Sequence, residues 1–279
     1  MHKLAPRLRI IAFGLTLISL VALSAQASAQ SRLSGYTAPE DWLDGDEGSP
    51  FAAFYTNLRR QEFKVDELRI GRNVADADEP VLYKELCMGL QVGTAGPLPG
   101  PFLRRVGIEG YAGFLGSSVT DHSEAERDDE IGSGLGFEFG GMMYINVGLE
   151  FQRGMEAGLL AGLGLHLGYS EYERSDRFDF NVAEFSNLAL PMVAGLYGML
   201  PVGAGTISAQ GGIDYAPAYT KLQFHDTREF VLDRDYELTR RKTIGYFVTL
   251  NFASGDFTGG ISYFWGPATG FRLTLGQRF

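Results

Sequence analysis

The last nine residues of the chain, Phe271-Arg272-Leu273-Thr274-Leu275-Gly276-Gln277-Arg278-Phe279, alternate between two kinds of side chain. Successive side chains of a β-strand point to opposite faces of the sheet. One face of this strand would carry Phe271, Leu273, Leu275, Gln277 and Phe279, and the opposite face would carry Arg272 and Arg278. An apolar face opposite a charged one suits a wall with lipid outside and polar packing inside. This dyad alternation is typical of a transmembrane β-barrel.

This ending resembles the C-terminal signature of Gram-negative outer-membrane barrels, in which a final phenylalanine closes the last strand. Phe271, Leu273, Leu275 and Phe279 match that signature, and Gln277 departs from it. The resemblance implies that these four residues are an assembly signal for the outer-membrane assembly machinery. It indicates the superfamily of small barrels rather than a particular member. The alternative for the ending alone is an edge strand of a soluble sandwich.

Residues 1–29 have the composition of a secretory signal peptide. Lys3, Arg7 and Arg9 form a basic start, residues 10–23 are apolar, and Ala27-Ser28-Ala29 supplies small residues before a cleavage site. The apolar run is shorter than the roughly 20 residues that a helix needs to cross a bilayer. Together with the ending, this segment predicts a location in the outer membrane of a Gram-negative bacterium.

The composition excludes several classes of protein. The net charge is −10, and cleavage after residue 29 would remove three positive charges and no acids, giving −13. That balance argues against a nucleic-acid partner, because phosphate binding needs a basic surface. The single cysteine, Cys87, permits no internal disulfide. A large sheet or core must therefore hold the exported chain together.

Two-residue periodicity recurs in eight segments from about residue 103 onward, with glycines and carboxylates opposite the aliphatic residues. The helical pattern of apolar residues at i, i+3, i+4 and i+7 is not seen in them. Short turns near 148–153, 201–205 and 254–256 alternate with longer charged connections near 117–130, 173–179 and 225–242. Outer-membrane barrels have short periplasmic turns and long extracellular loops.

The sequence therefore predicts an all-β, antiparallel up-and-down barrel of ten strands over residues 61–279. Residues 82–92 would form a ninth strand, and a tenth is expected near 63–70 because bacterial single-chain barrels have even strand numbers. Residues 30–60 are rich in Gly, Pro, Asp and Glu and are expected to form an irregular periplasmic lead-in. The alternative is an eight-stranded barrel with residues 30–100 as a periplasmic extension.

The positions that this register places inside the barrel carry both signs of charge. They are Arg105, Glu109, Glu138, Glu156, His166, Asp214 and Arg272. Buried charges must be paired, and barrels of about eight strands have interiors filled by side chains. We expect these residues to form a salt-bridge and hydrogen-bond network in a narrow lumen.

The sequence gives little support for catalysis or ligand chemistry. Some barrels of the superfamily that the ending resembles hydrolyse lipids or proteins with a histidine and a serine or acidic partner. Here His166 lies mid-strand without a serine at a convincing spacing, and His122 lies in a loop. The acids at 124–130 lack the spaced ligands of a calcium loop. We expect no catalytic residue, no metal, no cofactor and no enzymatic activity.

The predicted role is structural, or that of a narrow passive, porin-like pore. The alternatives are an adhesin-like barrel acting through its extracellular loops and a membrane-embedded, lipid-modifying hydrolase. The predicted partners are outer-membrane lipid and the assembly machinery.

Overall fold

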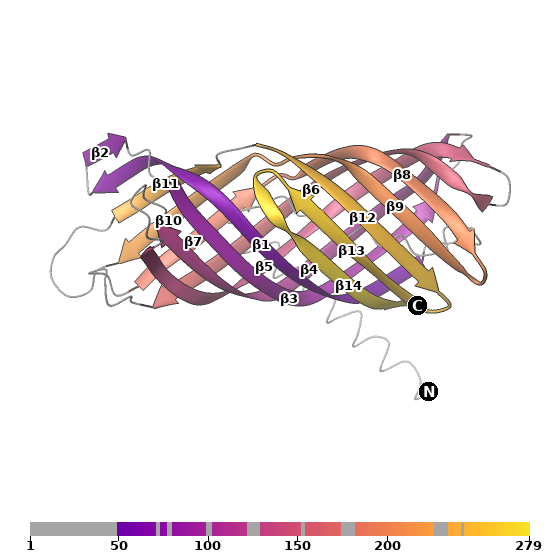
Figure 1. The fold of residues 1–279 in the computed structure, drawn as a ribbon, viewed down its shortest axis with the longest axis horizontal. Helices are drawn as coiled ribbons and strands as arrows, with labels where there is room; N and C mark the ends of the chain where they lie inside the picture. The colour runs from indigo at the N-terminus through magenta and orange to yellow at the C-terminus, as the bar shows by residue number, and fades with distance from the viewer. Residues whose placement is uncertain are drawn as a thin grey trace, which may run out of the picture.

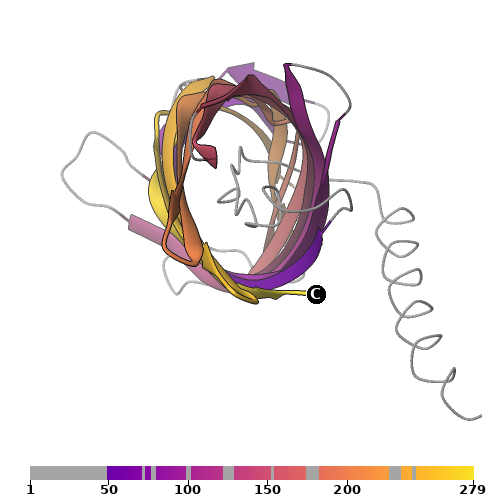
Figure 2. The same ribbon diagram turned by 90° about the vertical axis from the view of Figure 1, so that its right-hand side faces the viewer.

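The C-terminal strand pairs with the first strand and closes the sheet into a barrel in the computed structural model (Figures 1 and 2). The structure describes residues 49–70, 73–76, 80–98, 102–121, 129–151, 154–173, 182–225, 234–240 and 243–279. Within these ranges the strands are β1 (Ser49–Ile70), β2 (Asn73–Asp76), β3 (Pro80–Pro97), β4 (Leu103–Asp121), β5 (Asp129–Glu150), β6 (Glu156–Glu173), β7 (Val182–Ala189), β8 (Met192–Val202), β9 (Gly205–Tyr215), β10 (Ala218–His225), β11 (Arg234–Arg240), β12 (Ile244–Ser254), β13 (Phe257–Trp265) and β14 (Ala268–Arg278).

Three strands of the wall are interrupted, so that β7 and β8, β9 and β10, and β11 and β12 each form one strand in two pieces. Pro191 and Pro217 lie at two of the breaks, where proline cannot donate a ladder hydrogen bond. The backbone remains connected there, because Leu190 N donates to Pro217 O at 3.1 Å and Gly164 N donates to Pro191 O at 2.8 Å. With β2 alongside the end of β1, the wall is an antiparallel barrel of ten strands. The predicted fold class is confirmed.

The barrel has two widths. Residues 51–61 of β1 pair with β14, whereas residues 63–70 pair with β11. The hairpin of β13 and β14 stops near the middle of the barrel, as Figure 1 shows, and beyond it the ring consists of β1, β3, β4, β5, β6, β7, β10 and β11. We call the ten-stranded part the wide end and the eight-stranded part the narrow end. An eight-stranded barrel that leaves out residues 30–100 is wrong, since β1 and β3 belong to the wall.

A belt of apolar side chains surrounds the wide end. On β12 the outward residues are Ile244, Tyr246, Val248, Leu250 and Phe252, each 44–52% exposed. Trp265 stacks on Tyr246 and on Tyr263, at ring-centroid distances of 5.8 and 5.6 Å, where the belt meets the narrow end. An apolar surface of this extent needs a cover, and aromatic girdles border the lipid-facing band of outer-membrane barrels. No helix in the described ranges is long and apolar enough to cross a membrane.

The narrow end has the opposite polarity, with apolar residues inside. Its interior core consists of Phe63, Val81, Tyr83, Val119, Tyr172, Ala183, Phe185, Leu222 and Leu238, none more than 5% exposed. Tyr83 stacks on Phe185 with a centroid distance of 4.3 Å, and Phe63 packs edge-on against both rings. The outward positions of the same strands include Lys64, Lys84, Glu171, Glu184 and Lys221. The narrow end is therefore built like a small water-soluble barrel.

Two short turns at the wide end depend on glycine. Residues 203–204 join β8 to β9, and residues 255–256 join β12 to β13. Gly203 and Gly255 have φ angles of 66° and 57°. Two-residue hairpin turns need positive φ, which glycine adopts without steric cost. Both turns fall within the segments where the sequence predicts short connections.

The start of the barrel differs from the prediction. β1 begins at Ser49, so the predicted lead-in over residues 30–60 is wrong for its last part. Phe51, Ala53 and Tyr55 face inward and are buried, which hides the alternation because both faces of the strand carry large apolar residues. The predicted tenth strand at 63–70 is the narrow-end part of β1. The predicted signal peptide at 1–29 and most of the charged connections lie outside the described residues.

Candidate functional site

The seven residues predicted to face the lumen are all buried, at no more than 4% exposure. Arg105 and Glu109 lie on β4, Glu138 on β5, Glu156 and His166 on β6, Asp214 on β9 and Arg272 on β14. Strand alternation accounts for these positions, since each has at least one outward apolar residue beside it in the sequence. The structure divides most of them into two clusters, and Asp214 lies on a different part of the wall.

The central cluster is organised around the carboxylate of Glu138. Tyr55 Oη donates to Glu138 Oε1 at 2.5 Å, and Cys87 Sγ donates to the same oxygen at 3.0 Å. The three residues come from β5, β1 and β3, so the cluster links distant parts of the sequence. A buried carboxylate of this kind holds its neighbours in place because charge-assisted hydrogen bonds are stronger than neutral ones.

Arg272 links the last strand to this centre. Its guanidinium donates to Gln91 Oε1 at 2.5 Å, and Gln91 Nε2 donates to Glu109 Oε2 at 2.8 Å. Gln91 thus bridges the arginine and the glutamate that the sequence analysis placed together. Arg272 also lies 4.1 Å from the ring centroid of Tyr55, a cation–π distance.

His166 extends the central cluster toward β6. Its Nδ1 lies 2.7 Å from the hydroxyl of Tyr111, and the two rings stack at a centroid distance of 5.8 Å. Arg272 is 5.6 Å from the Tyr111 ring. The histidine therefore has a tyrosine partner in the lumen.

A second cluster lies farther from the narrow end than the central cluster does. Arg105 Nη1 donates to Glu156 Oε1 at 2.8 Å, and Arg105 Nη2 lies 2.7 Å from Glu156 Oε2. Tyr197 Oη donates to Glu156 Oε1 as well. The two-point contact between guanidinium and carboxylate fixes both groups in orientation.

A second buried ion pair, which the strand alternation did not predict, joins Arg59 on β1 to Glu85 on β3. Asn57 Nδ2 donates to Glu85 Oε1 at 3.4 Å. Arg59 lies within the predicted lead-in over residues 30–60. The sequence therefore gives no sign of a cation that could pair with Glu85. The alternation Tyr83, Glu85, Cys87, Gly89, Gln91 on β3 was the available signal, because it placed Glu85 inside. The described residues contain no group of three or more metal-ligating side chains that could hold an ion.

The fold and the polar interior define a transmembrane β-barrel of the outer-membrane type. Its fold is similar to that of the outer-membrane protease OmpT from Escherichia coli, with a TM-score of 0.50 and 10% identity over 83% of this chain and 96% of OmpT. An outer-membrane channel from Pseudomonas putida F1 matches with a TM-score of 0.35 and 12% identity, over 87% of this chain and 99% of the channel. The β domain of the Bordetella autotransporter BrkA matches with a TM-score of 0.36 and 14% identity, over 84% of this chain and 99% of that domain.

The likeness to OmpT shows the fold alone. No protein-family model matches the chain, and no curated protein matches it in sequence. The barrel fold predicted from the C-terminal strand is confirmed, and no specific member of the superfamily that this strand resembles is identified.

The prediction of no enzymatic activity is contradicted by the likeness to OmpT. A barrel with a similar fold is a protease in E. coli. The prediction rested on a filled lumen and on the missing histidine–serine spacing. Neither observation excludes chemistry at the end of the barrel, where the connecting segments lie outside the described residues.

Proposed function

We propose that the protein is a closed outer-membrane barrel that acts at the cell surface through its narrow end. The observation that carries this proposal is the apolar core inside the narrow end, where nine side chains at 5% exposure or less fill the interior. A passive pore needs a water-filled path through this region. The packing of Tyr83 on Phe185 and Phe63 favours a plugged lumen instead.

The polarity of the wall supports a surface role. The apolar belt ends at Tyr246 and Trp265, and the narrow end continues beyond it with charged residues on its outside. The connections 122–128, 174–181 and 226–233 join strands at this end, whereas connections of two to five residues close the other. Outer-membrane barrels place long loops outside and short turns in the periplasm. In this orientation the narrow end is a rigid stem that carries the loops above the lipid surface.

The proposed location is the outer membrane of a Gram-negative bacterium. The predicted signal peptide at 1–29 and the ending at Phe271, Leu273, Leu275 and Phe279 support export and insertion by the assembly machinery. Outer-membrane lipid would then cover the outward side chains of the apolar belt.

Orientation can be tested with single cysteines, because the natural Cys87 is fully buried. Gln223→Cys places a thiol on the outside of the narrow end, and the matched Asp256→Cys places one in a two-residue turn at the wide end. A membrane-impermeant maleimide is expected to label Gln223→Cys in intact cells and Asp256→Cys only after the outer membrane is permeabilised. The reverse pattern would contradict the proposed orientation.

Conductance separates the surface role from the pore. The purified barrel in a planar lipid bilayer is expected to give no stable open channel. A steady open conductance from the wild-type protein would favour the pore and defeat the proposal of a plugged lumen.

A second candidate is a hydrolase acting at the same end of the barrel, and the observation that favours it is the fold shared with a protease. The test is to incubate intact cells with a mixed library of fluorogenic peptides. Cleavage that depends on the protein and survives inhibition of other surface proteases would favour the hydrolase. No excess cleavage over cells that lack the protein would leave the non-enzymatic surface role as the better account.

A further inference from the structure

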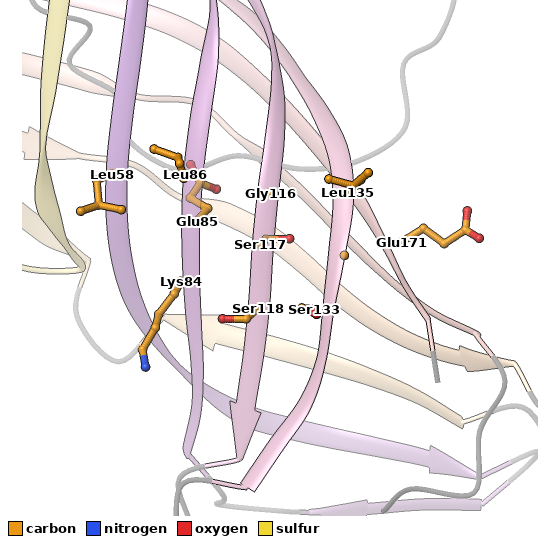
Figure 3. A pocket seen from close by; sticks show the side chains of 11 residues that line it. Leu58, Lys84, Glu85, Leu86, Gly116, Ser117, Ser118, Ser133, Leu135 and Glu171 are labelled. Atoms are coloured by element: carbon orange, nitrogen blue, oxygen red, sulfur yellow. The ribbon is translucent and has the colours of Figure 1, made fainter. Parts of the chain in front are cut away.

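An open groove lies on the outside of the barrel, where the apolar belt meets the charged narrow end. Its volume is about 850 Å³, and its lining comes from β1, β3, β4, β5 and β6. Figure 3 shows Leu58, Leu86 and Leu135 toward one end of the groove and Lys84, Ser118 and Ser133 toward the other. Apart from Glu171, which pairs with Leu135 at one end of the leucine row, the groove is apolar on its membrane side and polar on its narrow-end side.

The groove is hollow because Gly116 has no side chain, whereas its neighbours in the same row across the sheet are leucines. Leu58 pairs with Leu86, Leu86 with Gly116, and Gly116 with Leu135 across four neighbouring strands. A Cβ atom added at Gly116 would meet nothing within 4 Å. Phe114, two residues along β4 from Gly116, and Leu135, opposite Gly116 on β5, are 82% and 80% exposed and border this gap. The floor at Gly116 leaves room for a narrow apolar chain.

Two cations face each other one step nearer the narrow end. Arg60 on β1 is directly opposite Lys84 on β3, and both are exposed. Like charges directly opposite each other on one sheet face are destabilising. Ser118 pairs with Lys84, and Ser133 pairs with Ser118, so two hydroxyl side chains continue the row. An anion between the two cations would relieve their repulsion.

We propose that this groove holds one phosphate-bearing lipid of the outer leaflet. The phosphate lies between Arg60 and Lys84, with Ser118 as a hydrogen-bond donor, and one acyl chain lies over Gly116 between Leu86 and Leu135. Phosphate suits this place because charge-assisted hydrogen bonds to its oxygens are strong. Glu171 borders the opposite side, on β6, so the negative group belongs on the side of Arg60 and Lys84. A single lipid would place its phosphate beside Arg60 and Lys84 and its acyl chain over Gly116 at the same time.

The test compares phosphatidic acid with diacylglycerol of the same acyl chains, because the two differ only in the phosphate. Native mass spectrometry of the full-length barrel in detergent measures the bound fraction of each. We expect clear preference for phosphatidic acid, reduced by about 30-fold in the double variant Arg60→Gln/Lys84→Gln, given the roughly 1 kcal/mol that each basic residue contributes near an anionic lipid surface. Gly116→Leu, which fills the open floor, is expected to reduce binding of phosphatidic acid without changing the folded state.

Lys221→Gln is the matched control, because Lys221 is an outward lysine on β10, away from the groove. It should bind phosphatidic acid like the wild type. Equal binding of the two lipids, or unchanged binding in the double variant, would overturn the proposal. Displacement of the bound lipid by millimolar inorganic phosphate would assign the site to a free anion instead of a lipid.

Discussion

Replacing Arg105 with alanine is expected to lower the free energy of unfolding by about 3–5 kcal/mol, the usual cost of leaving one member of a buried ion pair alone. Glu156 is 2% exposed and receives both Arg105 nitrogens and the Tyr197 hydroxyl. Without Arg105 its charge stays in the lumen uncompensated. The measurement is a urea titration of the folded barrel, followed by the shift in mobility between unheated and boiled samples on a gel.

A second variant isolates the pair itself. Arg105→Gln together with Glu156→Gln keeps hydrogen-bonding groups at both positions and removes both charges, so it should recover part of the loss. Arg60→Ala removes an exposed cation and should change stability within about 0.5 kcal/mol. If the double variant were as unstable as the two single losses combined, the coupling between Arg105 and Glu156 would be refuted.

Deleting Phe279 is expected to reduce the amount of folded barrel in the outer membrane far more than Arg278→Ala does. Phe279 is 76% exposed on the outward row that also holds Leu273 and Leu275, and its backbone N donates to Pro50 O at 3.0 Å. Its loss removes both the proposed recognition side chain and a bond across the closing strands. Immunoblots of outer-membrane fractions, with unheated samples to score folding, measure the effect.

Phe279→Tyr provides the matched control, because it keeps an aromatic ring and the backbone bond. It should assemble nearly as well as the wild type. Normal levels of the Phe279 deletion in the outer membrane would show that this residue is not part of an assembly signal.

The wall of the wide end could be predicted because lipid imposes a strict alternation. On β12, every second residue from Ile244 to Phe252 is apolar and faces outward, so the residues between them must face inward. The same logic placed Arg105, Glu138 and Arg272 inside. It could not identify their partners, since Arg272 reaches Gln91, which is 181 residues away in sequence. Cross-barrel contacts of this kind depend on strand order and register, which alternation leaves open.

The first half of β1 could not be predicted for a related reason. Phe51 and Tyr55 face inward while Phe54 and Leu58 face outward, so apolar residues occur on both faces. The inverted polarity of the narrow end adds to this difficulty, because there the apolar residue marks the interior. Lys64 and Phe63 follow the opposite rule from Arg272 and Phe271. A single rule for inside and outside fails wherever the surroundings of the wall change from lipid to water.

The change from ten strands to eight also affects how the sheet can close. β1 is held by β14 over residues 51–61 and by β11 over residues 63–70, so its register is fixed against two partners. A shift of two residues along one partner would break the pairing with the other, which protects the junction against slippage. Closure of the barrel can also take place in two steps. In the first, β14 pairs with β1, and in the second, β11 pairs with the rest of β1. We therefore expect an assembly intermediate in which the wide end is closed and inserted in the membrane while β1 and β11 are still unpaired at the narrow end.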